Sequence, residues 1–217
     1  MRLMSYVKNY GGYTKSQLIS LQNENRILVN GIKKNLTYII EKEDVITIDN
    51  IVINKTDNKY YIYNKPVGIV CTNDINIKNN ILNAINLPHR VFCLGRLDKD
   101  SHGLIILTND GLLSNKLMNG NNDIEKEYLV KVKNEITSDF IKNIQKPMII
   151  SNKVTKPCKV FKIDNYSFRI ILTQGMYRQI RKMVKLNNNF VVDLYRIRIG
   201  DILLSDLKEG EIKEISI

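Results

Sequence analysis

The fold is decided by the stretch GRLDKDSHGLIILTNDG, which runs from Gly95 to Gly111. An apolar strand is expected on each side of a loop in which acidic and basic residues alternate. Gly95 and Gly103 bracket the loop, which allows its backbone to turn sharply and to approach a ligand closely. Asp98 lies mid-loop between two basic residues, surroundings that keep a carboxylate ionised. An aspartate bonded to its own turn is the structural alternative, but loops between rigid strands are where active-site groups gather.

A second motif, QGMYRQIRKMVK, covers residues 174–185. Gly175 follows a predicted strand and precedes a helical run, a geometry that offers free N–H groups to a phosphate. Four basic residues recur at helical spacing and predict one stripe: Arg178, Arg181, Lys182 and Lys185. A solvated helix face explains the same spacing, and the nearby Arg196 and Arg198 favour an RNA backbone site.

A third motif, EKEYLVKV, covers residues 125–132 and begins an alternating strand. Tyr128 is placed to stack on a splayed-out RNA base, and half-buried strand packing is the alternative. The sequence contains no phosphate-binding Walker loop, no nucleophile elbow and no dinucleotide fingerprint. Phosphoryl transfer, esterase chemistry and dinucleotide chemistry therefore have no support.

The charge of the chain favours a polyanionic partner. The 217 residues carry a net charge of +11. Residues 1–58 hold 8 Lys and Arg against 6 Asp and Glu, a net +2, which leaves 25 against 16, a net +9, for residues 59–217. Such an excess suits phosphate contacts. Basic proteins can also owe their charge to solubility alone.

The cysteines favour a reducing compartment. Cys71, Cys93 and Cys158 are widely spaced and match neither a metal-binding pattern nor a disulfide framework. The start of the chain has no apolar core of a signal peptide, and no apolar run is long enough to span a membrane. We expect a cytoplasmic protein with no metal and no cofactor.

The first fifty residues predict a compact module of two helices and a small sheet. Leu3, Val7 and Tyr10 recur at helical spacing, and Thr14 with Gln17 forms a capping box for a second helix that buries Leu18, Ile19 and Leu21. Residues 27–29 and the following Asn-Gly form a strand that enters a type I′ hairpin, and residues 45–48 form another strand. We expect this module over 1–50, a polar linker over 51–58 and a larger domain over 59–217.

The larger domain is expected to be α+β, because strands outnumber helices and do not alternate with them strictly. The expected strands are 60–63, 69–71, 91–94, 104–108, 128–132, 160–163, 168–172 and 190–194. The expected helices lie near 80–86, 111–118, 138–145 and 177–187.

The three motifs and the run YYIYNKPVGIVCT at residues 60–72, taken in their order along the chain, resemble the pseudouridine synthases of the small and large ribosomal subunits. The first module, with its RILVNG hairpin, resembles the S4-type RNA-binding domain. The runs GRLDKDS, NDIEKEYLV and TKPCKV are most similar to the F-type enzymes that act on 23S rRNA. The resemblance implies isomerisation of uridine to pseudouridine, on a mixed and mainly antiparallel sheet flanked by helices, in a monomer.

The resemblance also implies roles for single residues. Asp98 matches the catalytic nucleophile, Tyr128 matches a tyrosine that stacks on the target uracil, and Arg181 matches a basic residue that forms an ion pair with the catalytic aspartate. Arg96 matches an arginine that takes the place of the flipped nucleotide. Lys65-Pro66 shapes the sheet near the site, and Leu172 is either a wall of the base pocket or core packing. The remaining expected RNA-binding residues are Lys15, Arg26, Arg178, Lys182 and Lys185.

Three other functions stay open from the sequence. The same chemistry on 16S rRNA or on a tRNA stem-loop requires no different catalytic residues. A non-catalytic RNA-binding factor in ribosome assembly is the alternative of another class. The presence of Asp98, Tyr128 and Arg181 together argues against it, because a pure binder has no need of a shielded carboxylate.

Overall fold

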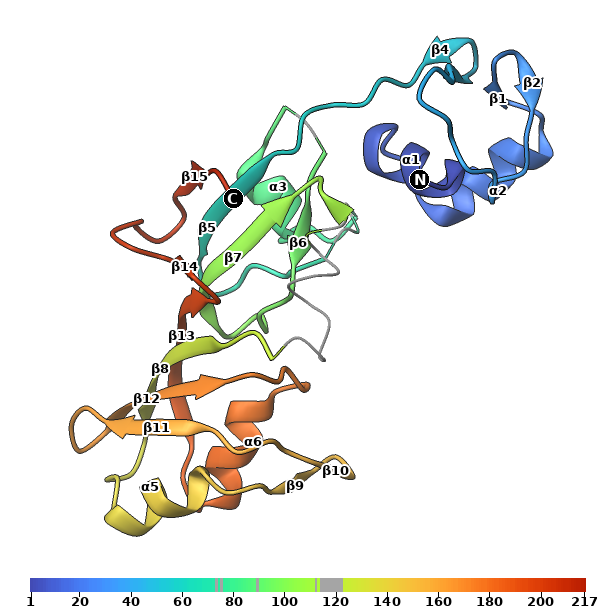
Figure 1. Ribbon diagram of the computed structural model, residues 1–217. Coiled ribbons are helices and arrows are strands. Elements are labelled where there is room, and N and C mark those ends of the chain that lie inside the picture. Colours follow the sequence, from blue (N-terminus) through green and yellow to red (C-terminus); the bar gives the residue numbers. More distant parts are fainter. Residues whose placement is uncertain (73, 75, 89, 112, 114–122) are drawn as a thin grey trace. The chain divides into compact units, whose positions relative to one another are not determined.

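The computed structural model describes residues 1–72, 74, 76–88, 90–111, 113 and 123–217 (Figure 1). The chain forms two compact units. Unit 1 is Met1–Lys59 with Asn109–Gly111, and unit 2 is Tyr60–Thr108 with Leu112–Ile217. Each unit has a hydrophobic core of its own.

The helices of unit 1 begin and end where the sequence predicts. Helix α1 (Leu3–Tyr10) ends before Gly11, and α2 (Lys15–Asn23) begins at the capping box of Thr14 and Gln17, which is confirmed. The prediction that Ile19 is buried is wrong, because its side chain is 44% exposed. Leu18 and Leu21, three residues apart, share the buried face of α2, and Ile19 points away from it.

The sheet of unit 1 has the strand order β2-β1-β3-β4, with every pair antiparallel. Its strands are β1 (Ile27–Val29), β2 (Ile32–Lys33), β3 (Ile46–Ile48) and β4 (Ile51–Val52). Asn30 and Gly31 both have positive φ, as the expected type I′ turn between β1 and β2 requires. Strand β4 lies within the segment expected as a linker.

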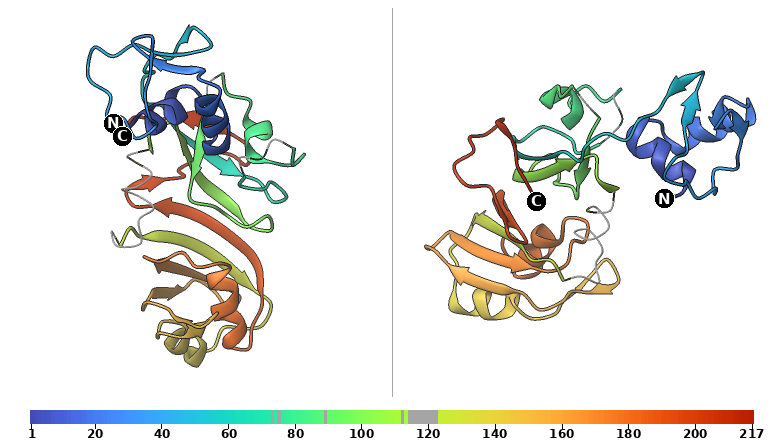
Figure 2. Two further views of the ribbon diagram at one scale, coloured as in Figure 1. Left: turned by 90° about the vertical axis from the view of Figure 1, so that its right-hand side faces the viewer. Right: turned by 45° about the horizontal axis from the view of Figure 1, so that its top comes forward.

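Unit 2 is built on a nine-stranded sheet with the path β11-β12-β8-β13-β7-β5-β15, to which β14 and β6 are added on β13 and β7. Only the pair β13–β7 is parallel among these strands. Figure 2 shows β8 and β13 running side by side through the middle of this sheet. The α+β fold with a mixed, mainly antiparallel sheet is confirmed. The strands are β5 (Tyr60–Lys65), β6 (Phe92–Leu94), β7 (His102–Thr108), β8 (Lys126–Val132), β11 (Lys159–Lys162), β12 (Ser167–Leu172), β13 (Val191–Ile199), β14 (Ile202–Leu203) and β15 (Ile212–Glu214).

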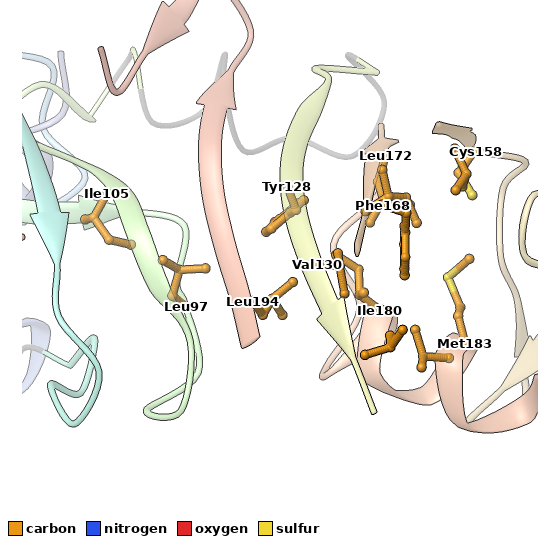
Figure 3. Close-up of a cluster of buried hydrophobic side chains, with 14 of the residues drawn as sticks. Leu97, Ile105, Tyr128, Val130, Cys158, Phe168, Leu172, Ile180, Met183 and Leu194 are labelled. Carbon is orange, nitrogen blue, oxygen red and sulfur yellow. The ribbon is translucent and has the colours of Figure 1, made fainter. Parts of the chain in front are cut away.

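The helices of unit 2 are α3 (Ile81–Ile85), α5 (Ser138–Ile144) and α6 (Gln179–Leu186) in the described residues, and β9 (Ile149–Ile150) pairs with β10 (Lys153–Val154) in a short hairpin. Helix α6 turns Ile180 and Met183 toward Val130 and Phe168 of the sheet (Figure 3). This packing fixes the helix that carries the basic motif against β8 and β12. None of the helices in the described part of the chain combines the length and apolar content that crossing a bilayer requires.

Two predicted elements of unit 2 differ from the structure. Residues 69–71 form no strand, only a single bridge between Val70 and Asn80. The reason is Lys65, whose buried Nζ donates to the carbonyls of Pro66 and Ile69 and so folds this segment into a loop. The strand predicted at 190–194 is longer and continues to Ile199. The helix expected at 111–118 lies outside the described residues, apart from Gly111 and Leu113.

Candidate active site

A cavity of about 950 Å³ opens in unit 2 beside the Gly95–Ser101 loop. Its walls are this loop, the start of β8 and the turn between β12 and α6. Among the described residues that line it there is one carboxylate, Asp98, and there are six basic side chains. The basic residues are Arg96, Lys99, Lys126, Lys156, Arg178 and Arg196.

The loop keeps its shape because two strands meet tightly behind it. Gly103 has φ +105°, and a Cβ there would lie 2.3 Å from the carbonyl oxygen of Arg196. Only glycine fits where β7 pairs with β13, with His102 and Gly103 opposite Tyr195 and Arg196. Within the loop, the N–H of Ser101 donates to the carbonyl of Asp98. The turn of the loop lies at Lys99 and Asp100, between the two glycines, and Gly95 has a positive φ of 73°.

Arg196 joins the strands to the loop from inside the protein. Its side chain is buried, and its Nε donates to the carbonyl of Leu104 at 2.8 Å. Its Nη1 donates to the carbonyl of Arg96, in the loop, at 3.4 Å. The guanidinium carbon also lies 6.0 Å from the centroid of the Tyr128 ring, at the limit of a cation–π contact. The sequence favoured Arg196 as part of an RNA backbone site. In the structure its side chain is buried and donates to backbone carbonyls inside the protein.

Tyr128 is nearly buried on β8, between Ile170 of β12 and Arg196 of β13 in register. It lines the same cavity as Asp98. Leu172 also lines the cavity and belongs to the hydrophobic core. The structure thus brings Tyr128 to the same cavity as Arg96 and Asp98, which belong to another motif of the sequence.

Asp98 lies close to Arg178 and not to Arg181. Its Oδ2 is 3.8 Å from Nη1 of Arg178, and its side chain is 26% exposed. The prediction of an ion pair between Arg181 and Asp98 is therefore wrong. Arg181 instead donates to the carbonyl of Asp100 at 2.7 Å and to Oγ of Ser101 at 3.0 Å. One turn of helix separates the two arginines, so Arg181 reaches the part of the loop beyond Asp98.

The predicted basic stripe on α6 is divided. Arg178 is the N-cap residue and has φ +52°, so it lies outside the regular helix. Lys182 donates to Oγ of Ser151 at 2.7 Å and packs over the ring of Tyr177, whereas Lys185 is exposed. Arg181, Lys182 and Lys185 are not among the residues that line the cavity.

The two candidate RNA-binding residues of unit 1 differ from each other. Lys15 is exposed at the start of α2. Arg26 holds Asp49 with two bonds of 2.6 Å and Glu24 with one of 2.8 Å. These hydrogen bonds lower the pKa of both carboxyls. The charge of Arg26 is therefore already compensated within the unit.

Several lining residues were not singled out from the sequence. Lys126 is half-buried, its Nζ donates to the carbonyl of Ile124, and burial lowers its pKa. The amide oxygen of Gln174 accepts from the backbone N–H of Lys156 and from the side chain of Gln179, so Gln174 builds the turn that closes the cavity. Lys126 and Gln174 lie in two of the quoted motifs, but no spacing signal indicates that the two residues line one cavity.

Two thiols lie behind the loop. Sγ of Cys71, which lines the cavity, accepts from the N–H of Leu97 at 3.5 Å. A hydrogen bond from Cys93 lowers the pKa of Cys71, and the same bond raises the pKa of Cys93. All three cysteines are free. In the described part of the chain, no three His, Cys, Asp or Glu residues gather as a metal site requires.

Comparison with known proteins decides the family. The family model described as RNA pseudouridylate synthase matches residues 59–186, which include Asp98, Tyr128 and α6. The chain belongs to this family. It is therefore an RNA pseudouridine synthase, an isomerase.

Relatives match along the whole chain. The dual-specificity RNA pseudouridine synthase RluF of Escherichia coli K12 is 37% identical over all of this chain and 76% of its own length. Ribosomal small subunit pseudouridine synthase A of Haemophilus influenzae is 28% identical over all of this chain and 96% of its own length. A crystal structure of a pseudouridylate synthase has a TM-score of 0.72 and 28% identity, and covers all of this chain and 96% of that one.

Proposed function

We propose that this protein converts a specific uridine of 23S rRNA to pseudouridine, with Asp98 as the nucleophile. One observation carries the role of Asp98: a single carboxylate stands among six basic side chains in the described lining of one cavity. The exposed cations among them, Arg96, Lys99 and Lys156, suit an RNA backbone. The carboxylate suits nucleophilic attack on the target nucleotide.

The reaction needs no outside atoms. The N1–C1′ bond of uridine breaks, the uracil turns, the C5–C1′ bond forms, and the proton that leaves C5 is balanced by one gained at N1. Asp98 assists by attack at C1′, by attack at C6 or through a glycal, and the arrangement suits each route. Neither an oxidant nor a group carrier enters this balance.

The other side chains have separate proposed roles. The target nucleotide has to leave its stack, which costs roughly a few kcal/mol. Tyr128, on the cavity wall, offsets this cost by stacking on the uracil, and Arg96 fills the gap in the RNA. Arg181 supports the loop through Asp100 and Ser101, so its proposed contribution is to hold the nucleophile's loop rather than to pair with Asp98.

Unit 1 is proposed to be an S4-like RNA-binding module. Its two helices and small sheet leave Lys15 exposed at the start of α2. We infer that it adds affinity and takes no part in the chemistry. With rRNA as substrate, the protein acts in the cytoplasm, and we propose that it acts as a monomer.

The proposal for 23S rRNA rests on the higher identity to the dual-specificity RluF enzymes than to the small-subunit enzymes, 37% against 28%. The name of the first group also supports a second RNA substrate. The match to small-subunit enzymes over 96% of their length keeps 16S rRNA as the second candidate.

The test is tritium release from 23S rRNA transcribed with [5-³H]uridine, with 16S rRNA and a tRNA pool as parallel substrates. We expect release from 23S rRNA by the wild-type protein and none by Asp98→Asn, which still binds the RNA. Release from 16S rRNA or tRNA alone would reassign the substrate. Release from none of them would favour a binding factor.

A further inference from the structure

Asp100, two residues after Asp98, is engaged by both arginines of the basic motif. Its carboxylate accepts from Nη1 of Arg178 at 3.0 Å and from Nη2 at 2.8 Å, a two-bonded pair. Nε of Arg181 lies 3.4 Å from the same carboxylate, and Nη2 of Arg181 donates to the backbone carbonyl of Asp100 at 2.7 Å. Both sides of this residue are therefore tied to the start of α6.

Arg178 is held in place by more than this pair. Its backbone has φ +52° and ψ +37°, the left-handed region that a side chain with a Cβ rarely adopts. Such a conformation persists where the surroundings over-determine it, and it is frequent at functional sites. The turn before α6 aims Arg178 at the loop, and Asp100 takes up both ends of its guanidinium.

The same guanidinium faces the nucleophile. Nη1 of Arg178, which donates to Asp100, is 3.8 Å from Oδ2 of Asp98. A direct charge-assisted hydrogen bond has a length of about 2.7–2.9 Å. Arg178 therefore stays near Asp98 without bonding to it.

We propose that Asp100 is a positioning residue that holds Arg178 close to Asp98 but out of direct contact with it. The proposal rests on the proposed role of Asp98 as nucleophile. A carboxylate that attacks loses its negative charge, so a cation bonded directly to it stabilises the ground state more than the transition state. A cation at a longer distance leaves the lone pairs of the carboxylate available for attack.

The test is Asp100→Asn, which keeps the shape of the side chain and removes its charge. Without the two-bonded pair, Arg178 closes on Asp98. We expect kcat for tritium release from 23S rRNA to fall about 10- to 100-fold, a modest share of what a positioned catalytic group contributes. KM should stay the same or fall, because one negative charge near the RNA is lost.

Two controls separate this role from a structural one. Asp201→Asn makes the same charge change in the turn between β13 and β14, away from the cavity, and should leave kcat unchanged. The double variant Asp100→Asn/Arg178→Gln should have a kcat no lower than Arg178→Gln alone, because no arginine is left to close on Asp98. Multiplied losses in the double variant, or a wild-type kcat in Asp100→Asn, overturn the proposal.

A crystal structure of Asp100→Asn gives a readout that does not depend on turnover. We expect a direct hydrogen bond between Arg178 and Asp98 in place of the 3.8 Å approach. An Arg178 that stays on residue 100 or turns to solvent contradicts the proposal. Failure of the proposed function has a different signature, namely tritium release that persists in Asp98→Asn or is absent from the wild-type protein.

Discussion

The two units are built from the same kinds of elements but place their charged groups differently. In unit 1 the ion pair of Arg26 with Asp49 lies at the surface, with side chains 45% and 40% exposed. In unit 2 Lys65 is fully buried and Arg196 is 3% exposed. Burying a charge is costly unless it is well hydrogen-bonded. Buried, hydrogen-bonded cations are therefore a feature of unit 2, which contains the cavity, whereas the Arg26 ion pair of unit 1 stays at the surface.

The largest effect on stability is expected from glycine substitutions, which compare the tight packing behind the loop of unit 2 with an open turn of unit 1. In Gly103→Ala, the new Cβ would lie 2.3 Å from Arg196 at φ +105°. Overpacking and backbone strain together should cost about 3 kcal/mol. In unit 1, Gly31→Ala shares a positive φ but meets nothing within 4 Å, and should cost only about 1 kcal/mol. Native-state hydrogen exchange of β7 and β1 amides measures each unit separately. Equal losses would remove the distinction.

Arg196→Met tests the buried cation itself. The carbonyls of Leu104 and Arg96 lose their donor, which should cost roughly 1–3 kcal/mol. Because the loop is then held less firmly, kcat for tritium release should fall about tenfold. Arg169→Met is the matched control, since this arginine on β12 is 42% exposed and pairs with Glu127. It should leave kcat unchanged, and a similar fall there would show that any lost arginine disturbs the site.

The smallest effects are expected in unit 1. Lys15→Ala should weaken the binding of 23S rRNA by roughly two- to threefold, as expected for one exposed phosphate contact. Arg26→Ala should change the affinity less, because Asp49 and Glu24 already compensate its charge. Filter binding at two salt concentrations compares the variants. A larger loss in Arg26→Ala would mean that RNA displaces its carboxylate partners.

Local signals in the sequence predicted local structure well. The capping box of Thr14 and Gln17 and the Asn30-Gly31 hairpin are confirmed, because each depends on neighbours within a few residues. The motif around Asp98 forms one wall of the cavity. Periodicity alone did not separate the exposed Ile19 from its buried neighbours.

Long-range contacts were beyond the sequence. Lys65 folds residues 66–69 around its ammonium group, which no strand pattern reveals. The arginine that lies nearest to Asp98 depends on the turn before α6. The left-handed conformation of Arg178 directs this side chain toward the loop. Helical spacing does not reveal that conformation, because it places Arg178 and Arg181 on one stripe. The one feature of the sequence that could have drawn attention to Asp100 is that it is a second carboxylate in the same charged loop.

The most direct test of the account is single-turnover tritium release from 23S rRNA over a range of enzyme concentrations. Three proteins are compared: the wild type, Asp98→Asn, and a chain that lacks residues 1–50. The account predicts that the shortened chain needs about tenfold more enzyme, as for a lost set of phosphate contacts, but reaches the wild-type rate constant at saturation. Asp98→Asn should bind the RNA and stay at background at every concentration. A shortened chain that saturates without turnover, or an Asp98→Asn that turns over, would contradict the assignment of catalysis to unit 2 and Asp98.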